Sequence, residues 1–499
     1  MRIKTDLKKL EWKIEKREYI IVFFIILLSI IGNSLNVNIE VSDELWNFQN
    51  IYKLYNGFEI YKDANIICTP LFFYIGNFIF HILGANFFVF RIYNIIIDTI
   101  LFFSVYILCK KMKMSKTSSL ITTFLLLFMG DYIIVLTMAN YNILALTFFI
   151  IGVIFALKGK LERKDFFIQG IIAFLIFFTK QNMGIYYFLA LIFMIMMQNG
   201  KLKEKIRNLS ITTATIILLG VIMLLYLYIT GHLEGFINYT ILGLGEFASE
   251  NILINISLLI VSLAIVSLNI YIAIKLIRKN WLSDEQNTKI KTFVIFSTFL
   301  TISILPIINK AHFCVGMFLS FVFIIYAIDL ILHNVFEKSE HFRIMKKMLA
   351  ILLILMGITL SIVNLMNWYT GIKNSNISSD SPFYGGIIED EQYEKIIRIT
   401  DYIKENEKKV IVLSGDAALY MVPLNKNNGN MDLPFRGNLG HQGEEGLIED
   451  LETLENTEVL IKKEKEKVNW QESEKVREYI IENFECIGVL EDYLIYDSK

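Results

Sequence analysis

Two adjacent carboxylates, Asp43 and Glu44, closely follow the first hydrophobic run of the chain, which extends from about Tyr19 to Leu35. A carboxylate held at a membrane surface can take a proton from an attacking hydroxyl or amine, which is the task of a general base. The position therefore favours catalysis on a lipid-borne substrate. The alternative is that the pair caps a helix, because negative charge at a helix N-terminus is stabilising.

Several polar side chains stand at the ends of apolar segments on the same predicted side of the membrane. Lys180 and Gln181 separate two apolar runs, and Lys310 and His312 belong to a turn too short to be a solvated loop. Lysines on this side run against the charge bias of membrane proteins, so we expect them to face a cavity. The alternatives are an ordinary interfacial lysine and a histidine that is hydrogen-bonded between helices.

Two further charged residues have both a functional and a structural interpretation. Arg91 lies near the outer end of an apolar segment, with Asp98 on the same helical face. It is a candidate anion ligand, but it could instead snorkel to the interface or pair with Asp98. Asp63 is the second acidic candidate, and its alternative is a turn residue in a polar loop.

The elements that must position these residues are membrane spans. Apolar residues make up 55% of the chain and charged residues 19%, below the usual quarter for soluble domains. Repeated apolar stretches of roughly 17–25 residues match the hydrocarbon thickness of a bilayer. About 11 transmembrane helices are predicted, near residues 19–36, 87–108, 117–136, 139–157, 166–180, 182–198, 207–230, 251–277, 291–308, 312–334 and 345–366.

Basic residues predict the orientation of the chain. The N-terminal segment 1–18 is basic, so we expect it to be cytoplasmic, and the other basic loops fall on the same side if about 11 helices span. Residues 19–366 would then form the transmembrane domain. Residues 367–499, whose strand and helix patterns predict a small α/β domain, would lie outside the membrane.

The first outer loop, residues 37–86, is predicted to hold two interfacial helices. One covers Ser42 to Asn56, with an apolar face that includes Leu45 and Phe48. The other begins at Pro70, and its apolar segment of about 15 residues reaches only ~22 Å, which is too short to span. The four cysteines of the chain are scattered without metal-type spacing, and a disulfide framework is not expected.

The order of motifs in this loop resembles the GT-C superfamily of membrane glycosyltransferases, which includes protein O-mannosyltransferases and the lipid A aminoarabinose transferase. The motifs are the acidic pair, the stretch Gly57-Phe58-Glu59-Ile60-Tyr61-Lys62-Asp63, the helix start Thr69-Pro70-Leu71, and Arg91. The resemblance extends over about residues 19–200. It departs from the family at Cys68-Thr69, where relatives carry Lys-Pro or His-Pro, so that cation must be absent or supplied elsewhere.

The resemblance implies a polyprenyl-phosphate-sugar donor and an extracytoplasmic acceptor, which would be a cell-envelope glycan, lipid or protein. Asp43 is then the candidate base of an inverting transfer, and Glu44 would orient it, bind a metal or bind the acceptor. Asp63, Arg91, Lys180, Gln181, Lys310 and His312 are the candidate substrate-binding residues. No metal ligand and no cofactor are assigned, although a divalent metal stays compatible with the acidic pair. Membrane lipids are expected partners, and nucleic acid is not.

Two other functions stay open at this point. A polysaccharide polymerase or ligase also joins lipid-linked sugars, although it is expected to carry arginines and histidines in one large central outer loop. A transporter or flippase of lipid-linked sugars is expected to show inverted repeats and broken helices, which the sequence does not display. A catalytically inactive relative is the third alternative.

Overall fold

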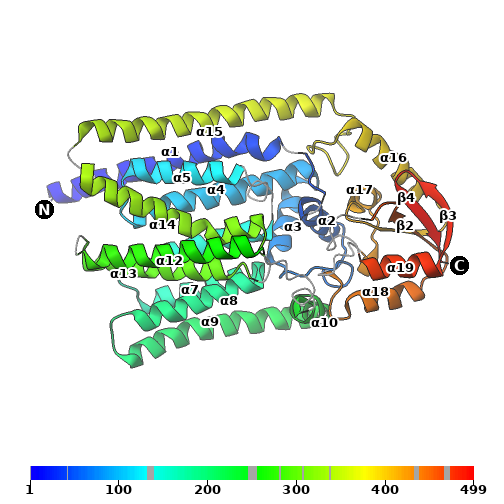
Figure 1. Ribbon diagram of the computed structural model, residues 1–499, viewed down its shortest axis with the longest axis horizontal. Coiled ribbons are helices and arrows are strands. Elements are labelled where there is room, and N and C mark those ends of the chain that lie inside the picture. The colour runs from blue at the N-terminus through cyan, green and yellow to red at the C-terminus, as the bar shows by residue number, and fades with distance from the viewer. Residues whose placement is uncertain are drawn as a thin grey trace.

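The computed structural model describes residues 2–36, 38–41, 43–131, 140–245, 255–279, 282–305, 308–336, 339–431, 438–465 and 473–498. These residues form a long helical bundle with a small α/β domain packed on one end (Figure 1). The predicted fold class is therefore confirmed.

Within the described residues, eleven helices run along the bundle, and each corresponds to one predicted span, although several predicted ends fall outside those residues. Six of the eleven are long and apolar enough to cross a membrane by length and composition alone. The helices are α1 (Arg2–Leu35), α4 (Phe87–Lys111), α5 (Lys116–Asp131), α6 (Tyr141–Ala156), α7 (Arg163–Thr179), α8 (Gln181–Met197), α9 (Leu202–Ile229), α12 (Ile256–Arg278), α13 (Asp284–Ile302), α14 (Lys310–Phe336) and α15 (Glu340–Asn374).

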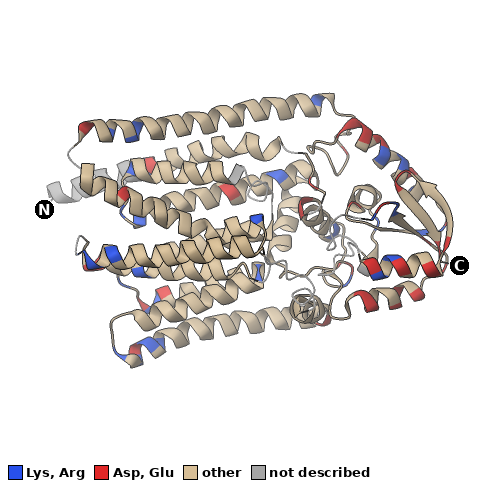
Figure 2. Ribbon diagram, viewed as in Figure 1, with Lys and Arg blue, Asp and Glu red and all other residues tan. Residues whose placement is uncertain are grey.

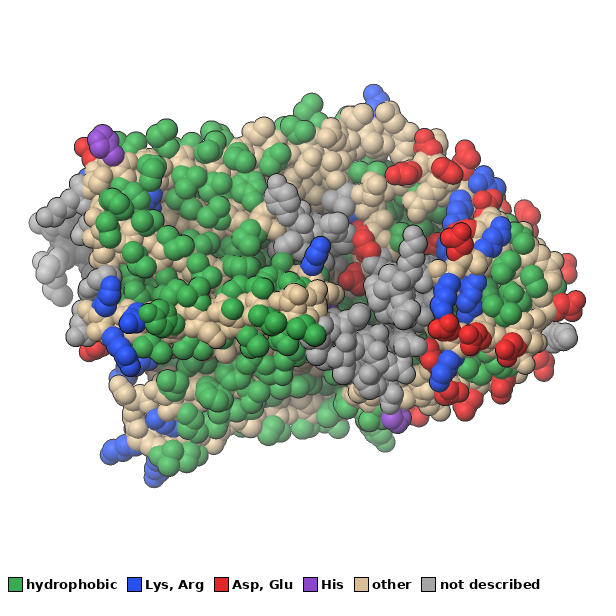
Figure 3. Space-filling view, viewed as in Figure 1, with side chains coloured by type: hydrophobic (Ala, Val, Ile, Leu, Met, Phe, Trp, Pro, Cys, Tyr) green, Lys and Arg blue, Asp and Glu red, His purple; other side chains and the backbone are tan. Residues whose placement is uncertain are grey.

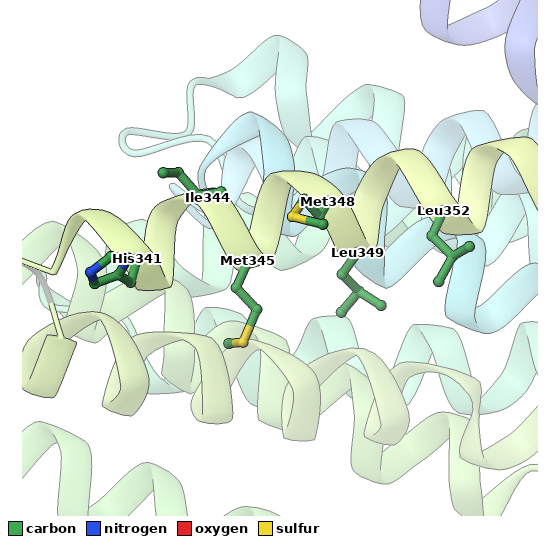
Figure 4. Close-up of a pocket in the computed structure, with 6 residues that line it drawn as sticks. All are labelled: His341, Ile344, Met345, Met348, Leu349 and Leu352. Atoms are coloured by element: carbon green, nitrogen blue, oxygen red, sulfur yellow. The ribbon is translucent and has the colours of Figure 1, made fainter.

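On the face shown in Figure 3, the middle of the bundle is covered by hydrophobic side chains, whereas charged side chains gather on the α/β domain and at the opposite end of the bundle. The α4–α5, α6–α7 and α8–α9 connections lie at the end of the bundle opposite the domain, and basic residues cluster there (Figure 2). A shallow groove on α15 is lined by residues of that helix alone, namely His341, Ile344, Met345, Met348, Leu349 and Leu352 (Figure 4). We regard it as lipid-facing surface.

Short helices fill the space between the bundle and the domain. These are α2 (Asp43–Tyr55), α3 (Leu71–Leu83), α10 (Leu233–Ile237) and the π-helix η2 (Asn238–Leu242). Helix α3 exposes Phe78 and Ile82, as an interfacial helix does. Helix α2 differs from the expected surface helix, because most of its residues are buried. Its Phe48 packs on Phe90 of the bundle and on Phe383 beyond α15, so both sides of α2 are covered.

The α/β domain contains a four-stranded sheet in the order β1-β2-β4-β3. Strand β1 (Lys409–Leu413) pairs parallel with β2 (Thr457–Lys462), and β4 (Tyr493–Asp497) pairs antiparallel with both β2 and β3 (Glu485–Leu490). The helical elements around the sheet are α16 (Asp390–Glu405), α17 (Ala418–Met421), η3 (Val422–Leu424), η4 (Gly429–Met431), α18 (Gly443–Glu452) and α19 (Glu474–Asn483).

One continuous hydrophobic core joins the bundle to the domain. It includes Phe48 of α2, Phe90 of α4, Leu419 of α17 and Val412 of β1. A second, smaller core lies between the sheet and helices α18 and α19. Since the larger core crosses the junction, the domain is packed on the bundle and not merely tethered to it.

The contact between α1 and α15 generates a test of the packing. A Cβ atom on Gly32 would lie 1.7 Å from the carbonyl oxygen of Ser361, so the two helices would have to separate. We expect Gly32→Ala to lower the free energy of unfolding by about 1–3 kcal/mol, the usual cost of overpacking. The measurement is the thermal unfolding midpoint of the purified protein in detergent.

The matched control is Gly220→Ala in α9, where an added Cβ meets no atom within 4 Å. Alanine favours a helix over glycine, so this variant should melt at or above the wild-type temperature. Equal melting of the two variants would contradict the close approach of α1 and α15.

Candidate active site

Glu44 and Arg91 form a buried ion pair that joins α2 to α4. The Arg91 Nε lies 2.7 Å from Glu44 Oε1, and Nη2 donates to Glu44 Oε2 at 2.9 Å. Both residues are fully buried. Arg91 Nη1 also donates to the carbonyl oxygen of Ser34 at 2.7 Å, which ties the end of α1 to the same point. The pairing of Arg91 with Glu44 is not apparent from the sequence.

Glu40 caps the first turn of α2, and Glu44 returns a hydrogen bond to it. The Glu40 N–H donates to Glu44 Oε2 at 3.1 Å, and the Glu44 N–H donates to Glu40 Oε2 at 3.0 Å. Burial raises the pKa of Glu44, and the Arg91 guanidinium acts against that rise. Glu44 is thus engaged with Arg91 and Glu40 and not with solvent.

Asp43 is exposed at the start of α2. Among the residues that the structure describes, no side chain hydrogen-bonds to its carboxyl group. Burial by the surrounding protein nevertheless raises the pKa of this carboxyl to about 6; the charge of Glu40 adds to the rise and the ammonium of Lys180 opposes it. Solvent can reach the group, yet little bulk water surrounds it, and such a carboxyl is suited to accept a proton near neutral pH.

Lys180 is a cation whose charge acts on Asp43. It lies between α7 and α8, is 9% exposed, and its Nζ donates to Asn142 Oδ1. The same ammonium stands 5.9 Å from the centre of the Tyr141 ring. Its charge acts on Asp43, Cys68 and His312, so each of these side chains lies within electrostatic range of Lys180. We call Asp43, Cys68, Tyr141, Lys180 and His312 the site cluster.

Cys68 is where the sequence departs from the GT-C pattern. Its side chain is buried, and burial raises the pKa of the thiol, so it carries no charge at neutral pH. The charge of the Lys180 ammonium opposes this rise of the thiol pKa, so the ammonium lies within electrostatic range of Cys68. A cation therefore does stand beside the position where relatives carry one, but it comes from a different segment of the chain.

His312 and Lys310 begin α14. The His312 ring is partly exposed, and its Nδ1 lies 2.9 Å from Asn309 Oδ1. Lys310 is exposed. The structure brings His312 into the site cluster and places Lys310 two residues before it.

Gln181 lies beside Lys180 but is engaged in the backbone. Its Nε2 donates to the carbonyl oxygens of Ile67 at 2.8 Å and Thr240 at 3.2 Å. Both amide hydrogens are thereby used, and the side chain joins α8, the first outer loop and η2 around the site cluster.

Asp63 lies away from the site cluster. Its Oδ2 accepts the Glu59 N–H at 2.6 Å, and its carbonyl oxygen accepts a hydrogen bond from Asn427 of the α/β domain at 2.8 Å. The Asp63 charge acts on Lys53, near the far end of α2. Ten helical residues separate Lys53 from Asp43, about 15 Å. This geometry agrees with the interpretation of Asp63 as a turn residue in a polar loop.

Sequence reasoning missed Tyr141 and Asn142. The signal that points to them is the polar run Asn140-Tyr141-Asn142 at the start of an otherwise apolar helix. Asn140 caps α6 by accepting from two backbone N–H groups, which aims the next two side chains at Lys180. Among the described residues, no group of three or more His, Cys, Asp or Glu side chains is arranged to hold a metal ion.

The buried pair predicts a large effect of removing one partner. Arg91→Met leaves Glu44 as an uncompensated buried charge, and we expect a loss of about 3–5 kcal/mol of stability, which is typical for breaking such a pair. Arg91→Met/Glu44→Leu should melt closer to wild type than Arg91→Met alone. If Arg91→Met instead melts like wild type and only transfer is lost, Arg91 acts on substrate.

Comparison with known proteins agrees with this architecture. Residues 68–226 match the family described as dolichyl-phosphate-mannose-protein mannosyltransferase. ArnT from Cupriavidus metallidurans, solved bound to undecaprenyl phosphate, is 9% identical with a TM-score of 0.55, over 96% of this chain and 98% of that one. The Archaeoglobus fulgidus oligosaccharyltransferase, solved with Zn and sulfate, is 12% identical with a TM-score of 0.50, over 89% of this chain and 68% of that one. No curated protein sequence matches the chain significantly.

At these identities the solved structures show a shared fold, and the family match adds the segment from Cys68 to Tyr226, which includes Arg91 and Lys180. The resemblance expected from the motif order is confirmed. The chain is a multi-pass membrane protein that shares the fold of ArnT and of the oligosaccharyltransferase, and its residues 68–226 resemble the mannosyltransferase family.

Proposed function

We propose that the protein is a glycosyltransferase that moves a sugar from a polyprenyl-phosphate carrier to an extracytoplasmic acceptor, with Asp43 as the general base. The observation that carries the proposal is that an exposed carboxylate and a buried cation lie within electrostatic range of each other. Asp43 is exposed and within electrostatic reach of Lys180. The ArnT neighbour, solved with undecaprenyl phosphate, supports a polyprenyl carrier.

The proposed step is a single displacement at the anomeric carbon. The acceptor oxygen or nitrogen forms a bond to this carbon while the bond to the phosphate oxygen breaks, and the electron pair leaves with the phosphate. The acceptor proton passes to Asp43. One displacement inverts the anomeric configuration.

Cationic groups would stabilise the charge that develops on the leaving phosphate. Lys180 is the best placed, because its ammonium is desolvated and held by Asn142. His312 and Lys310 are secondary candidates at the start of α14. Glu44, Arg91 and Gln181 are positioning residues in this proposal, since their polar groups are engaged with protein.

The basic connections lie at the end of the bundle opposite the site cluster, and such loops are usually cytoplasmic. We therefore propose that the N-terminus is cytoplasmic and that the site and the α/β domain lie outside. The acceptor is accordingly a cell-envelope glycan, lipid or protein. Cysteines introduced at position 63 and on α16 should be labelled from outside in intact cells; protection of both would overturn this orientation.

Asp43→Asn tests the base. With a panel of polyprenyl-phosphate sugars and membrane extract as acceptor, we expect turnover by wild type and a loss of at least ~10²-fold in the variant. Asp401→Asn, the same change on the exposed face of α16, should retain activity. Wild-type rates in a folded Asp43→Asn protein would remove Asp43 from the mechanism, and an inactive wild type would contradict the transferase proposal.

The pH profile tests the charge environment of Asp43. Only the carboxylate accepts a proton, and its pKa is raised to about 6, so kcat/KM should fall as the pH drops through about 6. The Lys180 ammonium stabilises this carboxylate; Lys180→Met should therefore move the acid limb to higher pH and also lower kcat by roughly 10²-fold or more. An unmoved acid limb in Lys180→Met would mean that Asp43 is not the titrating group.

A further inference from the structure

The C-terminal domain directly contacts the helix that carries Asp43. We propose that this domain is a positioning element of the active site and that Asn427 is the residue by which it holds α2. The kinetic part of this inference rests on the proposed transferase function, whereas the structural part does not.

Asn427 joins three segments of the chain. Its Oδ1 accepts a hydrogen bond from Lys53 Nζ of α2 at 3.2 Å and another from the Gly429 N–H of its own loop at 2.7 Å. Its Nδ2 donates to the carbonyl oxygen of Asp63 in the first outer loop at 2.8 Å. One amide group therefore links the domain to both α2 and the outer loop.

Lys53 is unusual because it is a lysine that is only 4% exposed. Burial lowers its pKa to about 7, and the charge of Asp63 opposes this shift. Burying an ammonium group costs free energy unless polar partners receive it. The Asn427 oxygen supplies one such partner, and it comes from the domain and not from the bundle.

Two further contacts join α2 to the part of the chain that follows α15. Phe383, in the segment between α15 and α16, packs 5.8 Å from the Phe48 ring of α2. Helix α17 also packs on α2. Helix α17 is itself fixed to the sheet, because the Tyr420 hydroxyl donates to Asp416 at 2.9 Å and Lys462 pairs with Asp416 at 2.6 Å.

The geometry makes α2 sensitive to this contact. The Glu44–Arg91 pair fixes the N-terminal end of the helix, and Lys53 lies about 14 Å further along, nine residues at 1.5 Å each. Loss of the contact at Lys53 would weaken the hold on the C-terminal half of α2, and a small tilt of the helix there would move Asp43 at its other end. Misplacement of a catalytic group by about 1 Å can cost on the order of 10²-fold in rate.

Asn427→Ala in the full-length protein tests the inference, with Asn483→Ala as the matched control. Asn483 is exposed on α19, and its amide bonds only within that helix. We expect hydrogen–deuterium exchange in the peptide covering Asp43–Tyr55 to accelerate about tenfold in Asn427→Ala and to stay unchanged in Asn483→Ala. With a donor that wild type uses, kcat should fall about 10- to 100-fold while KM changes less than about threefold.

Lys53→Met provides a second variant, since methionine keeps much of the apolar volume without the ammonium. It should accelerate exchange in α2 in the same way, and the Lys53→Met/Asn427→Ala double variant should add little to Asn427→Ala alone, because that change already removes the Lys53–Asn427 interaction. Wild-type exchange of α2 in both single variants would overturn the inference. So would a raised acceptor KM with unchanged kcat and exchange, which would assign the domain to acceptor binding. If wild type transfers no sugar, the proposed function fails, and the exchange measurement still decides this inference.

Discussion

The architecture of the site depends on one constraint: a helix of 13 residues must hold a carboxylate in place at the end of a membrane bundle. Isolated helices of this length are marginal in water, so α2 has to be held from outside. The buried Glu44–Arg91 pair provides that attachment, and the same guanidinium binds the end of α1. Three segments meet at one charged group, and the exposed position of Asp43 follows from where they meet.

Two neighbouring carboxylates have very different surroundings. Glu44 faces the interior, where an ionised group needs a partner, and it has Arg91. Asp43 is one residue earlier and faces outward. Successive side chains of a helix point about 100° apart, so Glu44 can be buried in an ion pair while Asp43 is exposed. The Lys180 ammonium likewise acts on the uncharged Cys68, although 112 positions separate the two residues in the chain.

The spans and the strands of the domain could be predicted from the sequence, because hydropathy and β-propensity are local properties. The burial of α2 could not, since the residues that cover it, such as Phe383 and Asn427, lie more than 300 positions away. The partner of Arg91 could not be predicted for the same reason. Helical spacing suggests Asp98, whereas Glu44 comes close to Arg91 only through the fold of the first outer loop. Lys180 and His312 could be named as candidates from the sequence, because an ionisable side chain in an apolar segment is costly and therefore points to a function. Tyr141 was missed because an aromatic residue in an apolar segment is ordinary and gives no functional signal.

The strand order has a consequence for how the protein is made. Strand β3 joins the sheet only through β4, which is later in the chain and lies between β2 and β3. Strand β4 also supplies Tyr493, whose hydroxyl lies 2.8 Å from Ser414 Oγ at the end of β1. During synthesis, then, the eleven bundle helices that the structure describes are made before the sheet that supports α17 against α2 can be completed. In the proposed orientation, the hairpin of β3 and β4 would have to cross the membrane before the sheet that supports α17 against α2 is complete.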